Sequence, residues 1–120
     1  MKGGVLRVFH DDTHQVDAVE EISLAYMQKA VGGNIERVPL VIGKYAYDMW
    51  VNEDGHRLAL PINKFGTYLY HKYRGADYPI LGNIFFTRGD KSEDCTPLDA
   101  DEIADLVLVL VLAQITNYEV

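Results

Sequence analysis

An uninterrupted apolar segment near the C-terminus, residues 106–113, places the strongest constraint on how this chain folds. It reads Leu-Val-Leu-Val-Leu-Val-Leu-Ala, so a helix here is apolar on every side yet far shorter than a membrane span. The alternation of leucine and valine also permits a central strand. A helix near residues 98–114 is favoured because strands rarely begin with so many carboxylates. It would start at Asp99, whose capping-box partner is Glu102, or at Thr96-Pro97.

A helix that is apolar on every side has more apolar surface than one small domain can bury. The chain has 120 residues, of which 48% are hydrophobic, which suits one core and a single domain over residues 1–120. We therefore expect a homo-oligomer in which a second copy covers the surface from Val107 to Leu112.

The N-terminus and the cysteine content indicate a cytoplasmic protein. Residues 1–4 lack the basic start, apolar stretch and small-residue cleavage site of a secretory signal. Cys95 is the single cysteine, so no internal disulfide is possible, which agrees with a reducing compartment. No membrane association is expected.

Alternating apolar residues and turn signals predict an α+β fold with a mainly antiparallel sheet of about five strands and two or three helices. In the strand that begins at Tyr45, the pattern places Tyr47 and Met49 on one face and Trp50 on the other. The turn signal at residues 52–55 predicts a hairpin with a return strand. The predicted strands cover residues 5–9, 35–40, 45–51, 56–60 and 80–87.

Two further helices are expected before the C-terminal one. Asp17 followed by Glu20 resembles a capping box, and glycines at residues 32–33 would close a helix near residues 18–31. Asn63 could cap a short helix that ends near residue 73, although a glycine and several aromatic residues make that segment ambiguous.

Four short segments in a fixed order carry a resemblance to a known family. They are Val31-Gly32-Gly33-Asn34-Ile35-Glu36-Arg37-Val38-Pro39-Leu40, Val51-Asn52-Glu53-Asp54-Gly55, Leu60-Pro61-Ile62-Asn63 and Ile80-Leu81-Gly82-Asn83-Ile84. In order and spacing, the chain resembles a family of phages and bacterial mobile elements catalogued as domain of unknown function 3846, over about residues 31–106. The resemblance implies a phage protein in the host cytoplasm and no particular chemistry. The aromatic stretch at residues 65–78 and the apolar C-terminal segment depart from the family pattern.

The middle of the chain interleaves aromatic, basic and amide side chains. Aromatic faces stack on bases, guanidinium and ammonium groups meet phosphates, and asparagine amides read base edges. This mixture suits a small nucleotide-derived ligand, whereas tyrosines that half-bury in a sheet and a core tryptophan would explain the same residues structurally. The candidate ligand-binding residues are Trp50, Asn52, Arg57, Asn63, Tyr68 and Arg74.

Negative charge is concentrated in one part of the sequence. Residues 90–105 carry seven carboxylates and one lysine, which accounts for −6 of the net charge of −7. This balance argues against direct nucleic-acid binding, because phosphate neutralisation needs a basic surface. The carboxylates could mimic nucleic-acid phosphates, or they could simply favour a helix N-terminus and keep the protein soluble.

No catalytic or metal-binding arrangement is supported. The segment His10-Asp11-Asp12-Thr13-His14 could bind a metal, but solvated Asp-rich turns are commonplace and no third distant ligand can be named, so an ordinary turn is the favoured interpretation. Asp48, Glu53 and Asp54 could be imagined as paired carboxylates, yet the last two belong to the hairpin turn. We therefore expect a protein that is not an enzyme and carries no cofactor and no metal.

The leading functional hypothesis is a phage accessory protein that counters host defence by sequestering a nucleotide-derived signal. In that case Arg57, Asn63, Tyr68 and Arg74 should converge near Trp50. The alternative is an acidic protein-binding inhibitor that acts as a nucleic-acid mimic against a host nuclease or surveillance complex.

Overall fold

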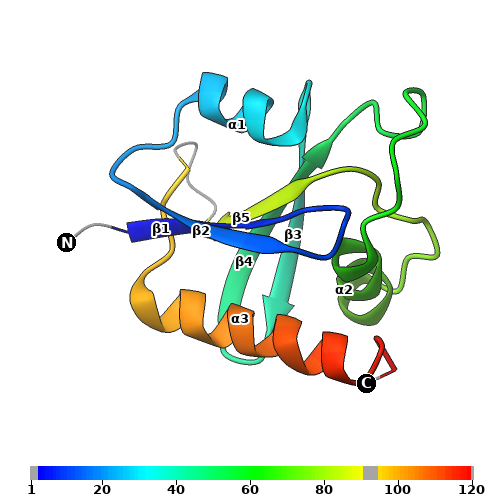
Figure 1. The fold of residues 1–120 in the computed structure, drawn as a ribbon. Helices are drawn as coiled ribbons and strands as arrows, with labels where there is room; N and C mark the ends of the chain where they lie inside the picture. Colours follow the sequence, from blue (N-terminus) through cyan, green and yellow to red (C-terminus); the bar gives the residue numbers. More distant parts are fainter. Residues whose placement is uncertain (1–2, 91–94, 120) are drawn as a thin grey trace.

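The chain forms one antiparallel sheet of five strands in the order β2-β1-β5-β4-β3, with three helices (Figure 1). The structure, a computed structural model, describes residues 3–90 and 95–119. The α+β fold expected from the sequence is confirmed. The strands are β1 (Gly3–Val8), β2 (His14–Val19), β3 (Ile35–Ile42), β4 (Tyr45–Asn52) and β5 (Ile84–Arg88). The helices are α1 (Leu24–Val31), α2 (Lys64–Arg74) and α3 (Ala100–Ile115).

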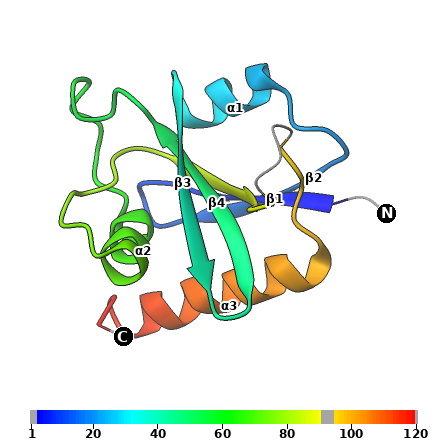
Figure 2. The same cartoon turned by 180° about the vertical axis from the view of Figure 1, so that it is seen from behind.

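The alternation of side chains along β4 separates two hydrophobic clusters on opposite faces of the sheet. Tyr47 and Met49 are fully buried in the larger cluster, beneath α2 and α3. Trp50 points to the other face, where it packs in the smaller cluster with Phe85 and with Met27 of α1. The two faces predicted for this strand are therefore confirmed. Figure 2 shows the β3–β4 hairpin from behind, with α2 beside it.

The apolar C-terminal segment is a helix and not a strand. Asp99 is the N-cap of α3 and completes a capping box with Glu102, as the sequence predicts. Leu106 and Leu110 are fully buried against the sheet. Four residues form an exposed apolar stripe along the opposite side of α3: Leu108, Val111, Leu112 and Ile115. Among the described residues, no helix is long and apolar enough to cross a membrane.

The first helix starts later than predicted, because residues 14–19 form β2. This strand pairs with β1 in the register Val8↔His14 through Gly3↔Val19. The Asp17 carboxylate accepts a hydrogen bond from the Tyr26 hydroxyl at 2.6 Å and does not cap a helix. The N-cap of α1 is Ser23. The predicted end is correct, since Gly32 closes α1 in the left-handed conformation with φ of 78°.

The return strand predicted at residues 56–60 is wrong. β4 already lies between β3 and β5, so neither of its edges is open to another partner. Residues 53–59 instead form consecutive turns, closed by backbone hydrogen bonds such as Leu60 N–H to Gly55 O at 3.0 Å. The late strand also begins at Ile84 and not at residue 80, because Gly82 adopts φ of 88° and interrupts the extended backbone.

The side chain of Asn63 joins three parts of the fold at one buried point. Its amide oxygen accepts a hydrogen bond from Gly66 N–H at 3.0 Å and so caps α2, as the sequence predicts. Its amide nitrogen donates to Val8 O at 3.0 Å and to Gly82 O at 2.9 Å. Asn63 therefore fixes the start of α2 against the end of β1 and the approach to β5.

Replacing Asn63 by alanine should lower the free energy of unfolding by about 3 kcal/mol, because one helix cap is lost and two buried carbonyls lose their donor. Urea denaturation followed by circular dichroism measures the loss. Ser23→Ala is the matched control, since Ser23 caps α1 with a single exposed hydrogen bond and should cost about 1 kcal/mol or less. Equal losses for the two variants would contradict the structural role assigned to Asn63.

The homo-oligomer expected from the sequence stays a prediction, and the exposed stripe of α3 provides a sharper test. Leu112 is 49% exposed, so Leu112→Asp should preserve the fold while it disrupts a dimer that buries the stripe. Light scattering measures the mass of both proteins. Leu24→Asp is the control, because Leu24 is 58% exposed on α1, away from the stripe. A monomeric wild-type protein would show that the stripe is not a self-association surface.

Candidate functional site

Two of the six predicted ligand-binding residues, Asn52 and Asn63, use their side-chain amides inside the protein. Asn52 is buried, and its nitrogen donates to Val31 O at the end of α1, at 3.1 Å. Its oxygen accepts from Asp54 N–H at 2.8 Å. Together with the three hydrogen bonds of Asn63, these contacts give both asparagines a role in the architecture of the fold.

The expected convergence around Trp50 does not occur. Trp50 stacks on Phe85 with ring centroids 6.1 Å apart, and its indole N–H donates to the Thr87 hydroxyl at 2.9 Å. Tyr68 lies on α2, where it packs against the larger cluster on the opposite face of the sheet. The alternation along β4 sends Trp50 away from α2, so one ligand does not contact both side chains.

The two predicted arginines, Arg57 and Arg74, lie on different elements and line no common cavity among the cavities described here. Arg57 is 71% exposed in the turn after β4, with Asp54 at 3.6 Å. Arg74 ends α2 and donates to Pro39 O on the edge strand β3 at 2.7 Å. It borders an open groove of about 550 Å³ that also contains Arg37 and Asp48.

The groove beside Arg74 holds a buried carboxyl group, that of Asp48, next to its arginines. Asp48 is 6% exposed, and Arg37 lies 3.8 Å from its carboxylate. Burial raises the pKa of Asp48 above its ordinary value, and the charge of Asp90 adds to the rise, whereas Arg37 opposes it.

A different surface of α2 gathers basic and aromatic side chains around one cavity. Lys64, Tyr68 and Lys72 are four residues apart, so they share one face of the helix. Tyr118, which follows α3, packs against Tyr68 with ring centroids 5.8 Å apart. We call the resulting cavity of about 470 Å³ the α2 groove. It is lined by Ile62, Lys64, Thr67, Tyr68, His71, Lys72, Tyr118 and Glu119.

Positive charge at the α2 groove is held close to aromatic rings. The Lys72 ammonium lies 5.5 Å from the centre of the Tyr68 ring and donates to the Tyr68 hydroxyl at 3.1 Å. This hydrogen bond raises the pKa of Lys72, because it stabilises the charged form of the ammonium. His71 lies beside Asp77 at 3.3 Å. Lys64 has no ion-pair partner among the described residues and is free to meet an anion.

Tyr118 is held in place by the turn between β1 and β2. The sequence did not predict Tyr118 as a site residue. The Tyr118 hydroxyl donates to the Asp12 carboxylate, and Gln114 donates to Asp12 O at 2.8 Å. Burial raises the pKa of Tyr118 above its ordinary value, and the hydrogen bond to Asp12 adds to the rise. This turn is the segment considered above as a metal site. No group of three His, Cys, Asp or Glu side chains within residues 3–90 and 95–119 is placed to hold a metal ion.

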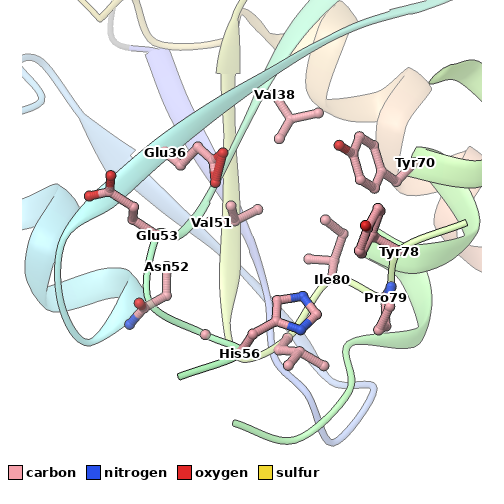
Figure 3. A pocket seen from close by; sticks show the side chains of 12 residues that line it. Glu36, Val38, Val51, Asn52, Glu53, His56, Tyr70, Tyr78, Pro79 and Ile80 are labelled. Atoms are coloured by element: carbon pink, nitrogen blue, oxygen red, sulfur yellow. The ribbon is translucent and has the colours of Figure 1, made fainter. Parts of the chain in front are cut away.

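A second cavity, of about 180 Å³, lies on the other flank of α2 (Figure 3). Tyr70 and Tyr78 stand on one side of this cavity, and Glu36 and Glu53 on the other. Segments that carry the family resemblance meet here, because residues 36–38, 51–55 and 80–81 supply much of the lining. We call it the Tyr78 pocket.

The described part of the acidic stretch is largely engaged within the fold. Glu102 accepts hydrogen bonds from Arg88, the shortest at 2.8 Å, while it also closes the capping box of α3. Asp99 lies 3.1 Å from the same guanidinium. Asp105 accepts a hydrogen bond from the Tyr47 hydroxyl at 2.9 Å. Glu93 and Asp94, which belong to the same stretch, lie outside the described residues.

Comparison with known proteins assigns the chain to a family without supplying an activity. A family model described as Domain of unknown function (DUF3846) matches residues 1–109. No curated protein and no solved structure shows significant similarity. The match includes all five strands, α1 and α2, whereas Tyr118 lies beyond it. Since nearly the whole fold is matched, the chain belongs to the family of domains of unknown function DUF3846.

Proposed function

We propose that this protein is a non-enzymatic phage accessory protein that binds and sequesters a nucleotide-derived signal of host defence in the α2 groove. The observation that carries the proposal is the gathering of Lys64 and Lys72 with the rings of Tyr68 and Tyr118 around one cavity. The phage setting rests on the family resemblance, and the role in countering host defence is part of the proposal itself.

The α2 groove offers the two kinds of contact that a nucleotide needs. Tyrosine faces stack on a base, and ammonium groups meet phosphate oxygens. Its volume of about 470 Å³ falls within the usual range of small-molecule sites. The chain as a whole is acidic, with a net charge of −7, so a local cluster of lysines attracts an anionic ligand to the α2 groove.

Sequestration fits the groove better than catalysis, because its hydroxyl and imidazole groups are engaged elsewhere. The Thr67 hydroxyl accepts a hydrogen bond from Ile80 N–H at 2.9 Å and donates to Ile80 O at 3.3 Å. The His71 imidazole lies 3.3 Å from the Asp77 carboxylate. The groove therefore supplies charge and ring faces without an activated attacking group.

The acidic-inhibitor alternative has less support in the described residues. Glu102 and Asp105 are both engaged within the fold, and a carboxylate that already accepts internal hydrogen bonds is a weaker mimic of a free phosphate. This alternative becomes the favoured one if the nucleotide experiment below fails.

The nucleotide proposal is tested by thermal melting with a panel of linear and cyclic nucleotides. A ligand at 100 times its Kd adds about 2.7 kcal/mol to native stability and should raise the midpoint by several degrees. Lys64→Gln with Lys72→Gln should weaken binding at least about tenfold, because two charge-assisted contacts to phosphate are lost. Tyr68→Ala should weaken it by a similar factor through lost stacking.

Arg57→Gln and Arg74→Gln are the matched controls, since both remove a positive charge outside the α2 groove. Affinity should be unchanged in these two variants. Loss of binding in the arginine variants alone would show that the groove is not the site. The absence of a midpoint shift with every nucleotide would contradict the proposal and favour the acidic inhibitor.

A further inference from the structure

The Tyr78 pocket has an apolar floor and aromatic walls. Val38, Val51 and Ile80 form the floor, and all three side chains are buried. Tyr78 is 70% exposed, and within the described residues its ring contact is a T-shaped one with His56, at 6.3 Å between ring centroids and an interplanar angle of 87°. Tyr70 of α2 completes this wall, as Figure 3 shows. Because most of the Tyr78 side chain is exposed, its ring is accessible to a ligand.

Glu36 points toward the aromatic wall across the pocket, whereas the carboxylate of Glu53, on the same side as Glu36, points away from the cavity (Figure 3). Glu36 lies on β3, in register with Val51 of β4, and Glu53 follows directly after β4. Within residues 3–90 and 95–119, neither carboxylate makes a hydrogen bond or an ion pair with another side chain. Both are exposed, so no desolvation penalty has to be compensated by an internal partner.

We propose that the Tyr78 pocket binds a small organic cation, an alkylammonium or guanidinium group. A cation is attracted to the faces of tyrosine rings and to carboxylates, and the alkyl part of such a group suits the apolar floor. The cavity of about 180 Å³ holds a group of this size and is too small for a whole nucleotide. A phosphate is repelled by Glu36 and Glu53.

The inferred site is independent of the nucleotide proposed for the α2 groove. Tyr70 of α2 belongs to the Tyr78 pocket, whereas Lys64, Tyr68 and Lys72 belong to the groove. Glutamates line the Tyr78 pocket and lysines line the α2 groove, so the two cavities on α2 favour ligands of opposite charge. The same cationic chemistry is found in a free amine and in a lysine or arginine side chain of a partner protein, and the experiment separates these two sources.

The test follows aromatic and amide NMR signals during titration with tetramethylammonium, n-butylammonium and n-butylguanidinium. The signals of Tyr70, Tyr78 and His56 should shift, and added salt should weaken binding. Glu36→Gln should weaken binding about fivefold, and Tyr78→Ala about two- to fivefold. Tyr78→Phe keeps the ring and should retain binding. Glu21→Gln, an exposed carboxylate in the loop before α1, is the matched control and should bind as the wild type does.

The neutral analogue n-butanol decides whether charge is recognised. Equal shifts with n-butanol and n-butylammonium would overturn the proposal, as would unchanged affinity in both Glu36→Gln and Tyr78→Ala. Short peptides that contain one lysine or one arginine distinguish the sources. Tighter binding of a peptide than of the free amine assigns the pocket to a protein partner, and weaker binding assigns it to a small amine. The amide spectrum of each variant verifies that it is folded.

Discussion

The position of α2 depends on the buried amide of Asn63, and both candidate binding cavities depend on the position of α2. Three hydrogen bonds from one side chain connect the helix start to carbonyl groups of Val8 and Gly82, which lie far apart in the sequence. Such a contact is stabilising chiefly because its loss would leave buried polar groups unpaired. The segment Leu60-Pro61-Ile62-Asn63 is joined to the segment Ile80-Leu81-Gly82-Asn83-Ile84 by the hydrogen bond from Asn63 to Gly82 O. This contact gives a structural reason for the two segments to occur together in the sequence.

Helical periodicity then divides the surface of α2 by charge. Residues four apart share one face, which brings Lys64, Tyr68 and Lys72 together, while Tyr70 faces the carboxylate of Glu36 across the Tyr78 pocket. The sheet contributes in the same way, because the period of two along β4 sends Trp50 to α1 and Tyr47 to α3. Local periodicity thus determines which side chains can act on one ligand.

Elements whose signals are local could be predicted from the sequence, whereas those set by distant pairing could not. The caps at Asp99 and Asn63 and the two faces of β4 depend on neighbouring residues, and each was predicted. β2 was missed because Asp17 and Glu20 imitate a helix cap, while its true partner is β1. At the site, the basic and aromatic character of the middle segment was recognised. Its geometry was not, since Asn52 and Asn63 bind distant carbonyls and Tyr118 is positioned through Asp12.

The contact between Arg74 and Pro39 also bears on how the protein avoids aggregation. β3 is an edge strand, and an edge strand can recruit a strand from another molecule through its unpaired backbone groups. Pro39 has no N–H to offer, and its carbonyl already accepts a hydrogen bond from Arg74. At Pro39, β3 therefore offers a second molecule neither an N–H donor nor a free carbonyl, which disfavours strand addition at this point of the edge.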